Sequence, residues 1–375
     1  MKILQIGKYF YPKKGGIETY EKILLDNLPF KFFLLVVNKK FEIKRYRKHK
    51  LIKIPKIFEI LDAPLMKPFN SFLNSLDYDL IHLNVPNPFA ELFLLLHFFL
   101  FKKTKKLLVT YHADPPIYTF FSKLLHWLRL PIIFLILKFA DRIIATTKTY
   151  ARTSPILKHF LKKVEVIPLS VDLPKVKVDI KKLKKKLKVK DEKIVLFVGR
   201  LYPYKGLEYL LKAFKYLENE KVKLVIVGDG VLKNKLKKMV EKLNLTSKVV
   251  FFGSVGEKEK VSLYKLCDIF VLPSINRGEA FGISILEAFN FGKPVISTFI
   301  EGSGVLELNL HNKTGLVVKP KDEKQLYTAI KKLLKNFRLR KKLGSGAKKR
   351  AKDFSLKKFV QRMKEIYISL SKSNL

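Results

Sequence analysis

The segment IFVLPSINRGEAFGISILEAFNFGKPVIST, residues 269–298, contains a short apolar run, a Gly-containing loop, a helical pattern and a second apolar run. Apolar runs of this length without strict alternation are typical of strands buried on both faces of a sheet. A strand, a helix and another strand in this order predict one unit of a parallel α/β sheet.

The same alternation recurs on both sides of this segment. Strand-like runs occur in the first half at residues 2–7, 31–38, 79–84, 106–112, 142–147 and 164–170. They recur in the second half at residues 193–201, 223–230, 248–255, 268–274, 293–298 and 314–320. Helical patterns lie between them, for example at residues 16–27, 88–102 and 148–161. We therefore expect an α/β protein with two Rossmann-like, doubly wound domains facing a central cleft.

A Lys-rich, Pro-containing passage after residue 169 separates the two sets of strands. The sequence predicts an N-terminal domain over residues 1–173, a second domain over residues 174–353, and a C-terminal helix over residues 354–375 that packs back on the first domain. Ligands of doubly wound sheets bind beyond the carboxyl ends of the strands, so we expect the site in the cleft.

Composition narrows the possible partners of the chain. Its 375 residues carry a formal net charge of +44, mostly from Lys. This charge favours anionic partners such as nucleic acid, anionic lipid or phosphorylated substrates. A solvated Lys-rich surface is the alternative. The single cysteine, Cys267, excludes an internal disulfide and fits a reducing compartment, and the seven histidines lack metal-ligand spacing.

Two apolar segments, residues 89–101 and 124–140, raise the question of a membrane. The first is shorter than the roughly 20 residues that a spanning helix needs, and Arg129 and Pro131 interrupt the second. Both can be core helices, or helices that lie in a membrane interface. The N-terminal apolar run is too short for a signal peptide and predicts a buried strand.

Several strand ends carry residues suited to binding an anion. Gly15 and Gly16 open a helix, where a backbone can approach a ligand and free N–H groups point at it. A plain tight turn explains the pair equally well. Arg200 lies at the end of the strand-like run at residues 193–201 and Lys205 follows it, and two cations there suit a diphosphate.

Two acidic residues in the opening segment, Glu279 and Glu287, stand in apolar surroundings. If a helix begins near Phe281, they lie about two turns apart, on the order of 12 Å. That separation matches the distance from the sugar to the ribose in a nucleotide-sugar, with helix N–H groups between them for the diphosphate. The alternative is a capping Glu279 and a surface Glu287.

Five motifs together resemble one family. EAFGISILEAFNFGKPVIST (residues 279–298) is similar to the E-x7-E signature of family-4 retaining glycosyltransferases, and FVGRLYPYKGLEYLLKAF (197–214) to their donor-phosphate strand. VIVGDG (225–230), HNKTGLVV (311–318) and GGIETY (15–20) follow the family's order. The likeness covers nearly the whole chain and implies a GT-B fold and an enzyme that transfers a hexose from a nucleotide-sugar.

The resemblance implies a role for each matching residue of the second domain. Glu279 would bind the hydroxyls of the donor sugar, and Glu287 those of the ribose. Arg200 and Lys205 would neutralise the diphosphate in place of a metal ion, so no metal or other cofactor is expected. The remaining donor-binding residues would be Phe281, Gly282 and Ile283.

In the first domain, the resemblance places Gly15 and Gly16 near the donor phosphates, His112 near the anomeric carbon and Asp114 on the acceptor side. Two departures from the family pattern stand out. Ser170 occupies a position where a Gly is common, and residues 299–308 read FIEGSGVLEL in place of a Gly-Gly turn, although Gly302 and Gly304 remain available for a phosphate-facing turn.

The mechanism implied by the family is same-face attack with retained configuration, in which the leaving phosphate oxygen helps to deprotonate the acceptor hydroxyl. An oxidoreductase would require G-x-G-x-x-G after the first strand, which the sequence lacks. A sugar-nucleotide epimerase or a phosphorylase of the same fold stays open. A nucleic-acid binder is supported by charge alone, so no sequence-specific nucleic-acid contact is expected.

The expected donor is a UDP- or GDP-sugar, and the acceptor a lipid-linked glycan or a polysaccharide. The basic charge and the aromatic-rich helices favour a protein of the cytoplasm that associates peripherally with the anionic inner face of the cell membrane.

Overall fold

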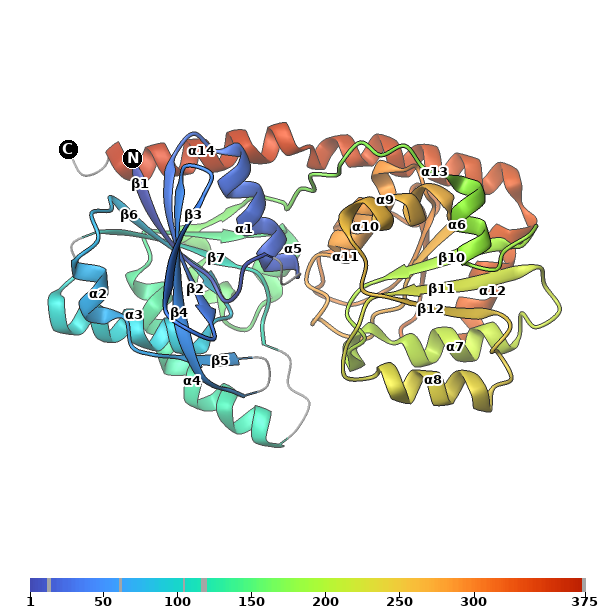
Figure 1. Cartoon of the computed structure of the whole chain (residues 1–375), viewed down its shortest axis with the longest axis horizontal. Helices are drawn as coiled ribbons and strands as arrows, with labels where there is room; N and C mark the ends of the chain where they lie inside the picture. The colour runs from blue at the N-terminus through green and yellow to red at the C-terminus, as the bar shows by residue number, and fades with distance from the viewer. Residues whose placement is uncertain (12–14, 61–62, 104, 116–119, 373–375) are drawn as a thin grey trace. The chain divides into compact units, whose positions relative to one another are not determined.

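The computed structural model describes residues 1–11, 15–60, 63–103, 105–115 and 120–372 (Figure 1). The chain divides into two compact units: residues 1–169 together with residues 356 onward, and residues 170–355. The sequence-based boundaries after residues 173 and 353 lie close to these positions. Each unit has its own parallel-stranded sheet with helices on its faces, so the α/β class with two Rossmann-like units is confirmed.

The first unit is built on a nine-stranded sheet in the described residues, in the order β3-β4-β2-β1-β6-β7-β8-β9, with β5 paired to β4. Neighbours from β4 to β9 along this order are parallel. The strands are β1 (Lys2–Ile6), β2 (Lys31–Asn38), β3 (Glu42–Tyr46), β4 (His49–Ile60), β5 (Ala63–Met66), β6 (Leu80–Val85), β7 (Lys106–Tyr111), β8 (Arg142–Ala145) and β9 (Val164–Val166).

Strands β3 to β5 were not predicted from the sequence. Both β3 and β5 pair antiparallel with β4, so this edge of the sheet is mixed. Strands β3 and β4 contain several Lys and Arg residues, and all of β3 is exposed or half-buried. Charged edge strands are one way in which proteins block further strand pairing. A search for strands buried on both faces does not find them, because one face of these strands is solvated.

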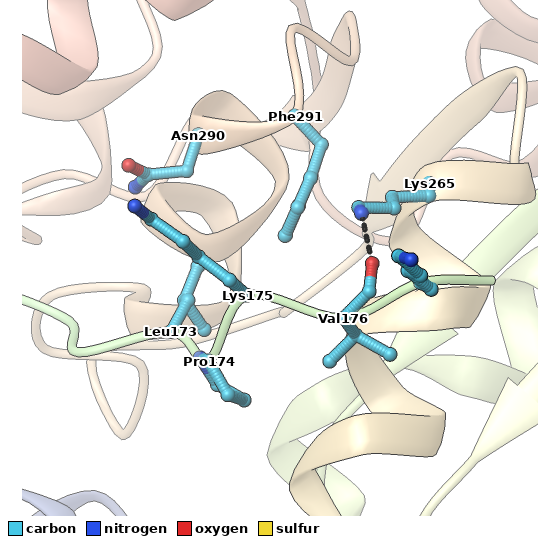
Figure 2. Close-up of a pocket in the computed structure, with 8 residues that line it drawn as sticks. Leu173, Pro174, Lys175, Val176, Lys265, Asn290 and Phe291 are labelled. Carbon is cyan, nitrogen blue, oxygen red and sulfur yellow. Dashed lines mark hydrogen bonds between the residues drawn. The ribbon is translucent and has the colours of Figure 1, made fainter.

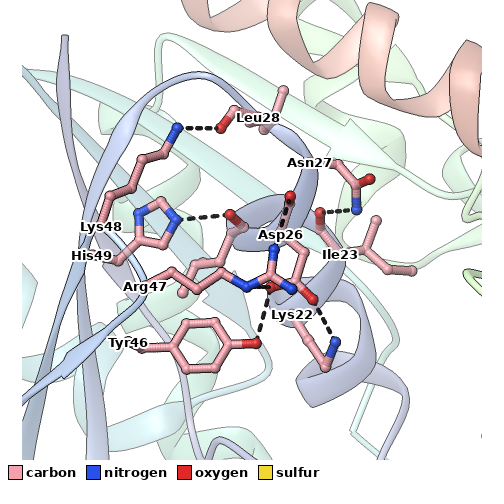
Figure 3. A network of polar contacts seen from close by, with 10 residues as sticks. Lys22, Ile23, Asp26, Asn27, Leu28, Tyr46, Arg47, Lys48 and His49 are labelled. Carbon is pink, nitrogen blue, oxygen red and sulfur yellow. Dashed lines mark hydrogen bonds and ion pairs between the residues drawn. The ribbon is translucent and has the colours of Figure 1, made fainter.

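A polar network joins helix α1 (Gly16–Asn27) to the β3–β4 hairpin (Figure 3). The buried Asp26 carboxylate accepts a hydrogen bond of 2.9 Å from the Tyr46 hydroxyl and pairs with Lys22 and Arg47. His49 is buried beside it: its Nδ1 accepts from the Phe32 N–H at 3.1 Å, and its Nε2 lies 2.7 Å from a carbonyl oxygen. These contacts fix the end of α1 and so the direction of its Gly-containing start.

The remaining helices of the first unit are α2 (Asn70–Asn74), α3 (Pro88–Phe101), α4 (Phe120–Phe139), α5 (Lys148–Thr153), the 3-10 helix η1 (Leu157–Lys163) and α14 (Leu356–Lys372). The helix predicted over residues 148–161 is therefore wrong in its second half. Ser154 is extended, with ψ of 129°, because it precedes Pro155, and the residue before a proline avoids helical geometry.

Helices α3 and α4 lie side by side in the first unit, as Figure 1 shows. The Arg129 guanidinium of α4 makes two hydrogen bonds of 2.7 Å to the Glu91 carboxylate of α3, and both side chains are buried. Arg129 therefore interrupts the apolar run of α4 in order to pair inside the protein. Among the helices in the described part of the chain, none combines the length and the apolar character needed to cross a membrane.

The second unit contains a six-stranded parallel sheet in the order β12-β11-β10-β13-β14-β15. In chain order this is 3-2-1-4-5-6, the order of a Rossmann fold. The strands are β10 (Lys193–Val198), β11 (Val222–Val227), β12 (Val249–Gly253), β13 (Ile269–Leu272), β14 (Val295–Thr298) and β15 (Gly315–Val318). All six predicted runs of this half form strands.

Figure 1 shows α7 and α8 on one side of β10 to β12, and α6, α9 and α10 on the other. The helices of this unit are α6 (Ile180–Lys186), η2 (Pro203–Lys205), α7 (Leu207–Lys215), α8 (Lys233–Lys242), α9 (Glu257–Leu266), α10 (Ile283–Asn290), α11 (Val305–Leu308), α12 (Glu323–Lys335), α13 (Phe337–Ala351) and η3 (Lys352–Phe354). The strand order reverses between β10 and β13, and ligands of such sheets bind at that point.

Candidate active site

The loop after β10 carries the two predicted cations of the second unit. Arg200 is exposed, and its guanidinium lies 4.6 Å from the centre of the Tyr202 ring. Lys205 ends the short helix η2 and is buried. Gly206 follows with φ of +64°, and a Cβ there would lie 2.2 Å from the Pro273 carbonyl oxygen. A glycine is therefore required for η2 to approach the loop after β13.

This approach brings Lys205 and Glu279 together across 74 residues of sequence. The Lys205 ammonium donates to Glu279 Oε2, and the Ser274 hydroxyl donates to the same oxygen at 3.0 Å. Both charged residues are only 7% exposed. Burial disfavours the ammonium form, but Glu279 outweighs this effect and raises the pKa of Lys205 above its ordinary value. The loop thus contains a desolvated, paired positive and negative charge.

The helix expected near Phe281 begins two residues later, and the alternative in which Glu279 caps it is not found, because the N-cap is Gly282. Helix α10 begins at Ile283, and its N-cap Gly282 has φ of +88°, a left-handed conformation that cannot continue a helix backwards. Glu279 lies in the preceding loop, so Glu279 and Glu287 do not share a helix and the expected 12 Å along one axis does not apply. Phe281, Gly282 and Ile283 instead form the entrance to α10, where the first N–H groups of a helix have no intrahelical acceptor.

The segment after β14 packs against this entrance. The Gly304 N–H donates to the Ala280 carbonyl oxygen at 2.8 Å, and the buried Ser303 hydroxyl donates to the Glu279 carbonyl oxygen at 2.5 Å. Gly302 has φ of +72°. The turn at Gly302 and Gly304 is thus adjacent to the Glu279 loop, as a phosphate-facing turn requires, although its residues differ from the family's Gly-Gly.

Glu287 lies within α10 and is buried, not on the surface. The Tyr264 hydroxyl donates to its Oε2 at 2.7 Å, and the Lys260 ammonium lies 2.5 Å from its Oε1. Burial, reinforced by the Glu287 carboxylate, raises the pKa of Tyr264 well above its usual range. Burial opposes the charge of Lys260, but Glu287 and Glu257 raise its pKa overall.

A pocket of about 740 Å³ opens behind this cluster, at the segment that enters the second unit (Figure 2). Lys175, Val176, Lys265 and Phe291 are among its lining residues, and the Lys265 ammonium donates to the Val176 carbonyl oxygen at 2.6 Å. The Phe291 ring stacks on Tyr264 with centres 5.9 Å apart. None of the predicted site residues lines this pocket.

The predicted residues of the first unit occupy the corresponding strand ends of the first sheet. Gly15 is the N-cap of α1, in an extended conformation, and a Cβ there would meet the Glu18 carboxylate at 2.2 Å. A Cβ at Gly16 would meet no atom of the described residues within 4 Å. Residues 12–14, which precede this start, lie outside the described residues.

His112 follows β7 and is buried. Its Nε2 lies 3.0 Å from Asn84 Oδ1, and the Asn84 amide nitrogen donates to Glu21 Oε1 at 3.0 Å. Burial lowers the pKa of His112 to about 3. The imidazole is therefore neutral at physiological pH.

Asp114 lies two residues beyond His112 and is held by neighbouring hydroxyls. Its Oδ1 accepts from Tyr111 at 2.8 Å and from Ser154 at 2.7 Å, and its Oδ2 accepts from Tyr150 at 2.9 Å. This carboxylate anchors the loop after β7 to α5. These contacts are structural, and the acceptor-side role of Asp114 stays a prediction.

Several residues around the predicted ones were not singled out from the sequence. Lys260, Tyr264, Ser274, Ser303 and Asn84 are among those that contact predicted residues, and Glu21 contacts Asn84. Glu21 carried a signal in the sequence. Glu21 interrupts the apolar face of α1 formed by Ile17, Leu24 and Leu28, and a carboxylate on such a face requires partners. Ser274 and Ser303 carried none, because small hydroxyl residues are common in loops. Among the described residues, no group of three His, Cys, Asp or Glu could hold a metal ion.

Comparison with known protein families identifies the class of enzyme to which the chain belongs. The model of "Glycosyl transferases group 1" matches residues 179–350, and that of "Glycosyltransferase Family 4" matches residues 35–175. The chain belongs to family 4 of the glycosyltransferases and has the GT-B fold. It is a glycosyltransferase, and the resemblance found in the sequence is confirmed.

Three known proteins are similar to the chain over most of its length. O-antigen chain mannosyltransferase C of Escherichia coli is 30% identical over the full length of both chains. D-rhamnosyltransferase WbpZ of Pseudomonas aeruginosa is 34% identical over 72% of this chain and 68% of its own. The structure of Anabaena Alr3699/HepE in complex with UDP-glucose superposes with a TM-score of 0.76 at 21% identity, over 98% of this chain and 100% of the other.

Proposed function

We propose that this enzyme transfers a hexosyl group, of the mannose type, from a nucleoside-diphosphate sugar to an acceptor hydroxyl with retention of configuration. The observation that carries the proposal is the buried Lys205–Glu279 pair beside the start of α10. It combines a carboxylate for sugar hydroxyls with a cation and helix N–H groups for a diphosphate. The mannose-type sugar rests on the names of the two bacterial relatives.

Each step of the reaction has a residue suited to it. Glu279 would accept hydrogen bonds from sugar hydroxyls, and Glu287 from the ribose. As the bond from the anomeric carbon to the phosphate oxygen breaks, Lys205, Arg200 and the N–H groups at α10 would stabilise the negative charge of the leaving group. The acceptor oxygen forms the new bond on the same face, and its proton passes to that phosphate oxygen. Because these cations neutralise the diphosphate, we expect no requirement for a divalent metal.

Thermal unfolding with UDP, GDP, ADP and NAD, each with and without a chelator, tests the donor site. We expect one nucleoside diphosphate to raise the Tm, with no effect of the chelator, and Glu287→Gln to abolish the shift. Gln keeps an oxygen for the Tyr264 hydroxyl, so it separates ribose binding from loss of the fold. A shift by NAD alone would overturn the proposal.

Product analysis distinguishes transfer from the two alternatives of the same fold. GDP-mannose and UDP-glucose, incubated with hydrophobic glycoside acceptors, should yield a new glycosidic bond with the anomeric configuration of the donor, read from NMR coupling constants. Inverted product would refute retention. Isomerised nucleotide-sugar without transfer would favour the epimerase, and phosphate-dependent release of a sugar phosphate the phosphorylase.

We further propose that the acceptor is a lipid-linked glycan at an anionic membrane, on the inner face of the cell envelope. Exposed apolar side chains at the start of α4 support this: Phe120, Leu124, Trp127 and Leu128, with the exposed Lys123 among them. An adjoining pocket of about 410 Å³ is lined by Trp127, Phe134 and Ile156, among others. Exposed aromatic and aliphatic side chains beside Lys suit a membrane interface.

Trp127 is the only tryptophan of the chain and is 62% exposed, so its fluorescence reports on this surface directly. Vesicles containing phosphatidylglycerol should shift its emission to shorter wavelength and should co-sediment the protein at low salt. Leu128→Glu should weaken both effects. Phe337→Glu, which changes a similarly exposed apolar residue of the second unit, is the matched control and should leave them unchanged. No emission shift with these vesicles would refute the membrane surface.

A further inference from the structure

The first unit contains a buried polar chain that the expected roles do not use. It runs from Glu21 on α1 through Asn84 at the end of β6 to His112 after β7. All three side chains are buried. Glu21 lies against Gly7, where a Cβ would be 1.9 Å from Glu21 Oε1. The residue after β1 must therefore be glycine for the carboxyl group to reach Asn84.

The direction of these hydrogen bonds determines the tautomer of His112. The Asn84 amide nitrogen donates to Glu21 Oε1, so the Asn84 oxygen faces His112. An amide oxygen can only accept, and therefore the His112 Nε2 carries the proton. In a neutral imidazole the other nitrogen, Nδ1, then has a free lone pair. Nδ1 makes no hydrogen bond to a residue that the structure describes.

The surroundings keep His112 neutral and fix its ring. The Tyr20 ring packs edge-on against it with centres 4.9 Å apart, and the Tyr20 hydroxyl bonds to Thr110 at 2.9 Å. His82 is the other imidazole of this cluster, and it is held separately, by Thr110 and Tyr367. Burial also raises the pKa of Glu21 well above its ordinary value.

We propose that Glu21 and Asn84 are positioning residues, which hold His112 as the Nε2–H tautomer so that Nδ1 accepts a hydrogen bond from a hydroxyl group of the bound substrate. This inference rests on the proposed function, because it assigns His112 to the substrate. It assigns a role to two residues that the resemblance left without one, and it states which nitrogen of His112 contacts the substrate. The second carboxylate oxygen of Glu21 is buried without a hydrogen-bond partner, which a purely structural network would avoid.

Two variants of Glu21 with side chains of similar volume distinguish a positioning role from a purely structural one. Glu21→Gln keeps an oxygen that accepts from the Asn84 amide. Glu21→Leu removes it, and the Asn84 side chain is then free to turn its nitrogen toward His112 and move the proton to Nδ1. Histidine labelled with ¹⁵N shows in long-range ¹H–¹⁵N spectra which ring nitrogen is protonated, and His112→Gln assigns the signals among the seven histidines.

We expect His112 to carry its proton on Nε2 in the wild type and in Glu21→Gln, and on Nδ1 in a substantial fraction of Glu21→Leu. Turnover by Glu21→Leu should fall about tenfold, the equivalent of one hydrogen bond to the substrate, with little change in KM for the nucleotide-sugar. Glu21→Gln should restore most of that loss. In Asn84→Asp, the new carboxylate should move the titration of His112 to near-neutral pH. His82 serves as the internal control, and its signals should stay in place.

Three results would overturn the inference. The wild-type protein could carry the His112 proton on Nδ1, Glu21→Leu could leave both tautomer and turnover unchanged, or the His82 signals could shift as much as those of His112. The spectra need no substrate, so they also separate this inference from the proposed function. Correct tautomers without any transfer would refute the function alone, and transfer with incorrect tautomers would refute the inference alone.

Discussion

At the scale of single residues, the Lys205–Glu279 pair shows how a loop can hold charges in a protein interior. Each charge is almost fully desolvated and is compensated by the other, and the Ser274 hydroxyl also donates to the Glu279 carboxylate. A buried pair contributes little net stability, because desolvation cancels most of the attraction. Breaking one partner is costly, since it leaves an uncompensated charge. The pair is therefore better explained by a role in substrate binding than by a contribution to the stability of the fold.

Removal of one charge and removal of both charges of the pair should affect stability differently but activity alike. Glu279→Gln leaves the Lys205 charge buried and should lower the free energy of unfolding by about 3 kcal/mol. The double variant Glu279→Gln/Lys205→Met removes both charges and should recover most of that stability. Both proteins should lose transfer activity by about 100-fold or more, because donor contacts are gone. Urea unfolding and initial rates measure the two effects.

If the double variant regained activity together with stability, the pair would be structural, and the sugar-binding role of Glu279 would be incorrect.

The buried histidines of the first unit predict an unusual dependence of stability on pH. Burial lowers the pKa of His82 and His112 to about 3, and lowers that of His49 as well. The unfolded chain binds these protons below about pH 6.5, and the folded chain does not, so stability is lost as pH falls from 6.5 toward 3. The upper limit is about 1.4 kcal/mol per pH unit for each histidine.

Glu21 acts in the opposite direction, because its pKa is raised in the folded state and its protonation stabilises the fold as pH falls. Glu21→Gln removes this opposing effect and should therefore steepen the loss of stability with falling pH. Urea midpoints at pH 7.5, 6.5 and 5.5 provide the measurement, in a range where most carboxylates stay ionised. Equal stability across that range in both proteins would mean that the histidines are hydrated.

At the scale of elements, the position of α10 depends on one residue, Gly282. Its φ of +88° ends the Glu279 loop and starts the helix, so the loop can carry Glu279 toward Lys205 while the helix carries Glu287 toward Lys260 and Tyr264. A residue with a Cβ is strained in that conformation. The same residue therefore determines where the free N–H groups of α10 point.

Gly282→Ala should lower the free energy of unfolding by about 1–2 kcal/mol and should weaken nucleotide binding more than the stability loss explains. Gly256→Ala is the matched control. Gly256 is also an N-cap, of α9, but its φ is −72° and a Cβ there would meet no atom within 4 Å. Thermal unfolding with and without the nucleotide compares the two. Equal effects of the two substitutions would show that the left-handed conformation of Gly282 is important neither for stability nor for nucleotide binding.

At the scale of the whole molecule, the two units differ in how the chain builds them. The second unit is one continuous segment, residues 170–355. The first requires both ends of the chain, because α14 supplies buried Phe359, Met363 and Tyr367, and the Tyr367 hydroxyl lies 2.6 Å from His82 Nδ1. A continuous segment with its own sheet and core can fold alone, whereas an incomplete core cannot.

We expect residues 170–355, expressed alone, to unfold cooperatively and to show the same nucleotide selectivity as the full chain. Residues 1–169 alone should expose apolar surface and bind a hydrophobic dye, and a peptide of residues 356–372 added in trans should reduce that binding. Circular dichroism, calorimetry and dye fluorescence test both expectations. Cooperative folding of residues 1–169 without the peptide would contradict the assignment of α14 to this core.

Much of the secondary structure was predicted from local patterns in the sequence. Each of the twelve apolar runs predicted from the sequence forms a strand, and β4 is the parallel strand that they did not include. Such runs are reliable because strands buried on both faces have a composition that few other elements share. Strands β3 to β5 were missed, since β3 and β4 carry charged residues among partly exposed ones and β5 has only four residues. The helical start at Phe281 was misplaced, because a left-handed glycine cannot be recognised from composition.

The sequence by itself determined the α/β class, the two repeated sheets, the family and the identity of most candidate site residues, since periodicity and short motifs are local properties. The tertiary structure alone decided which residues meet. Lys205 reaches Glu279 because Gly206 allows η2 to contact the loop after β13, and Glu21 reaches Asn84 because Gly7 has no side chain. Such contacts depend on close approach between distant segments, which no pattern along the chain encodes.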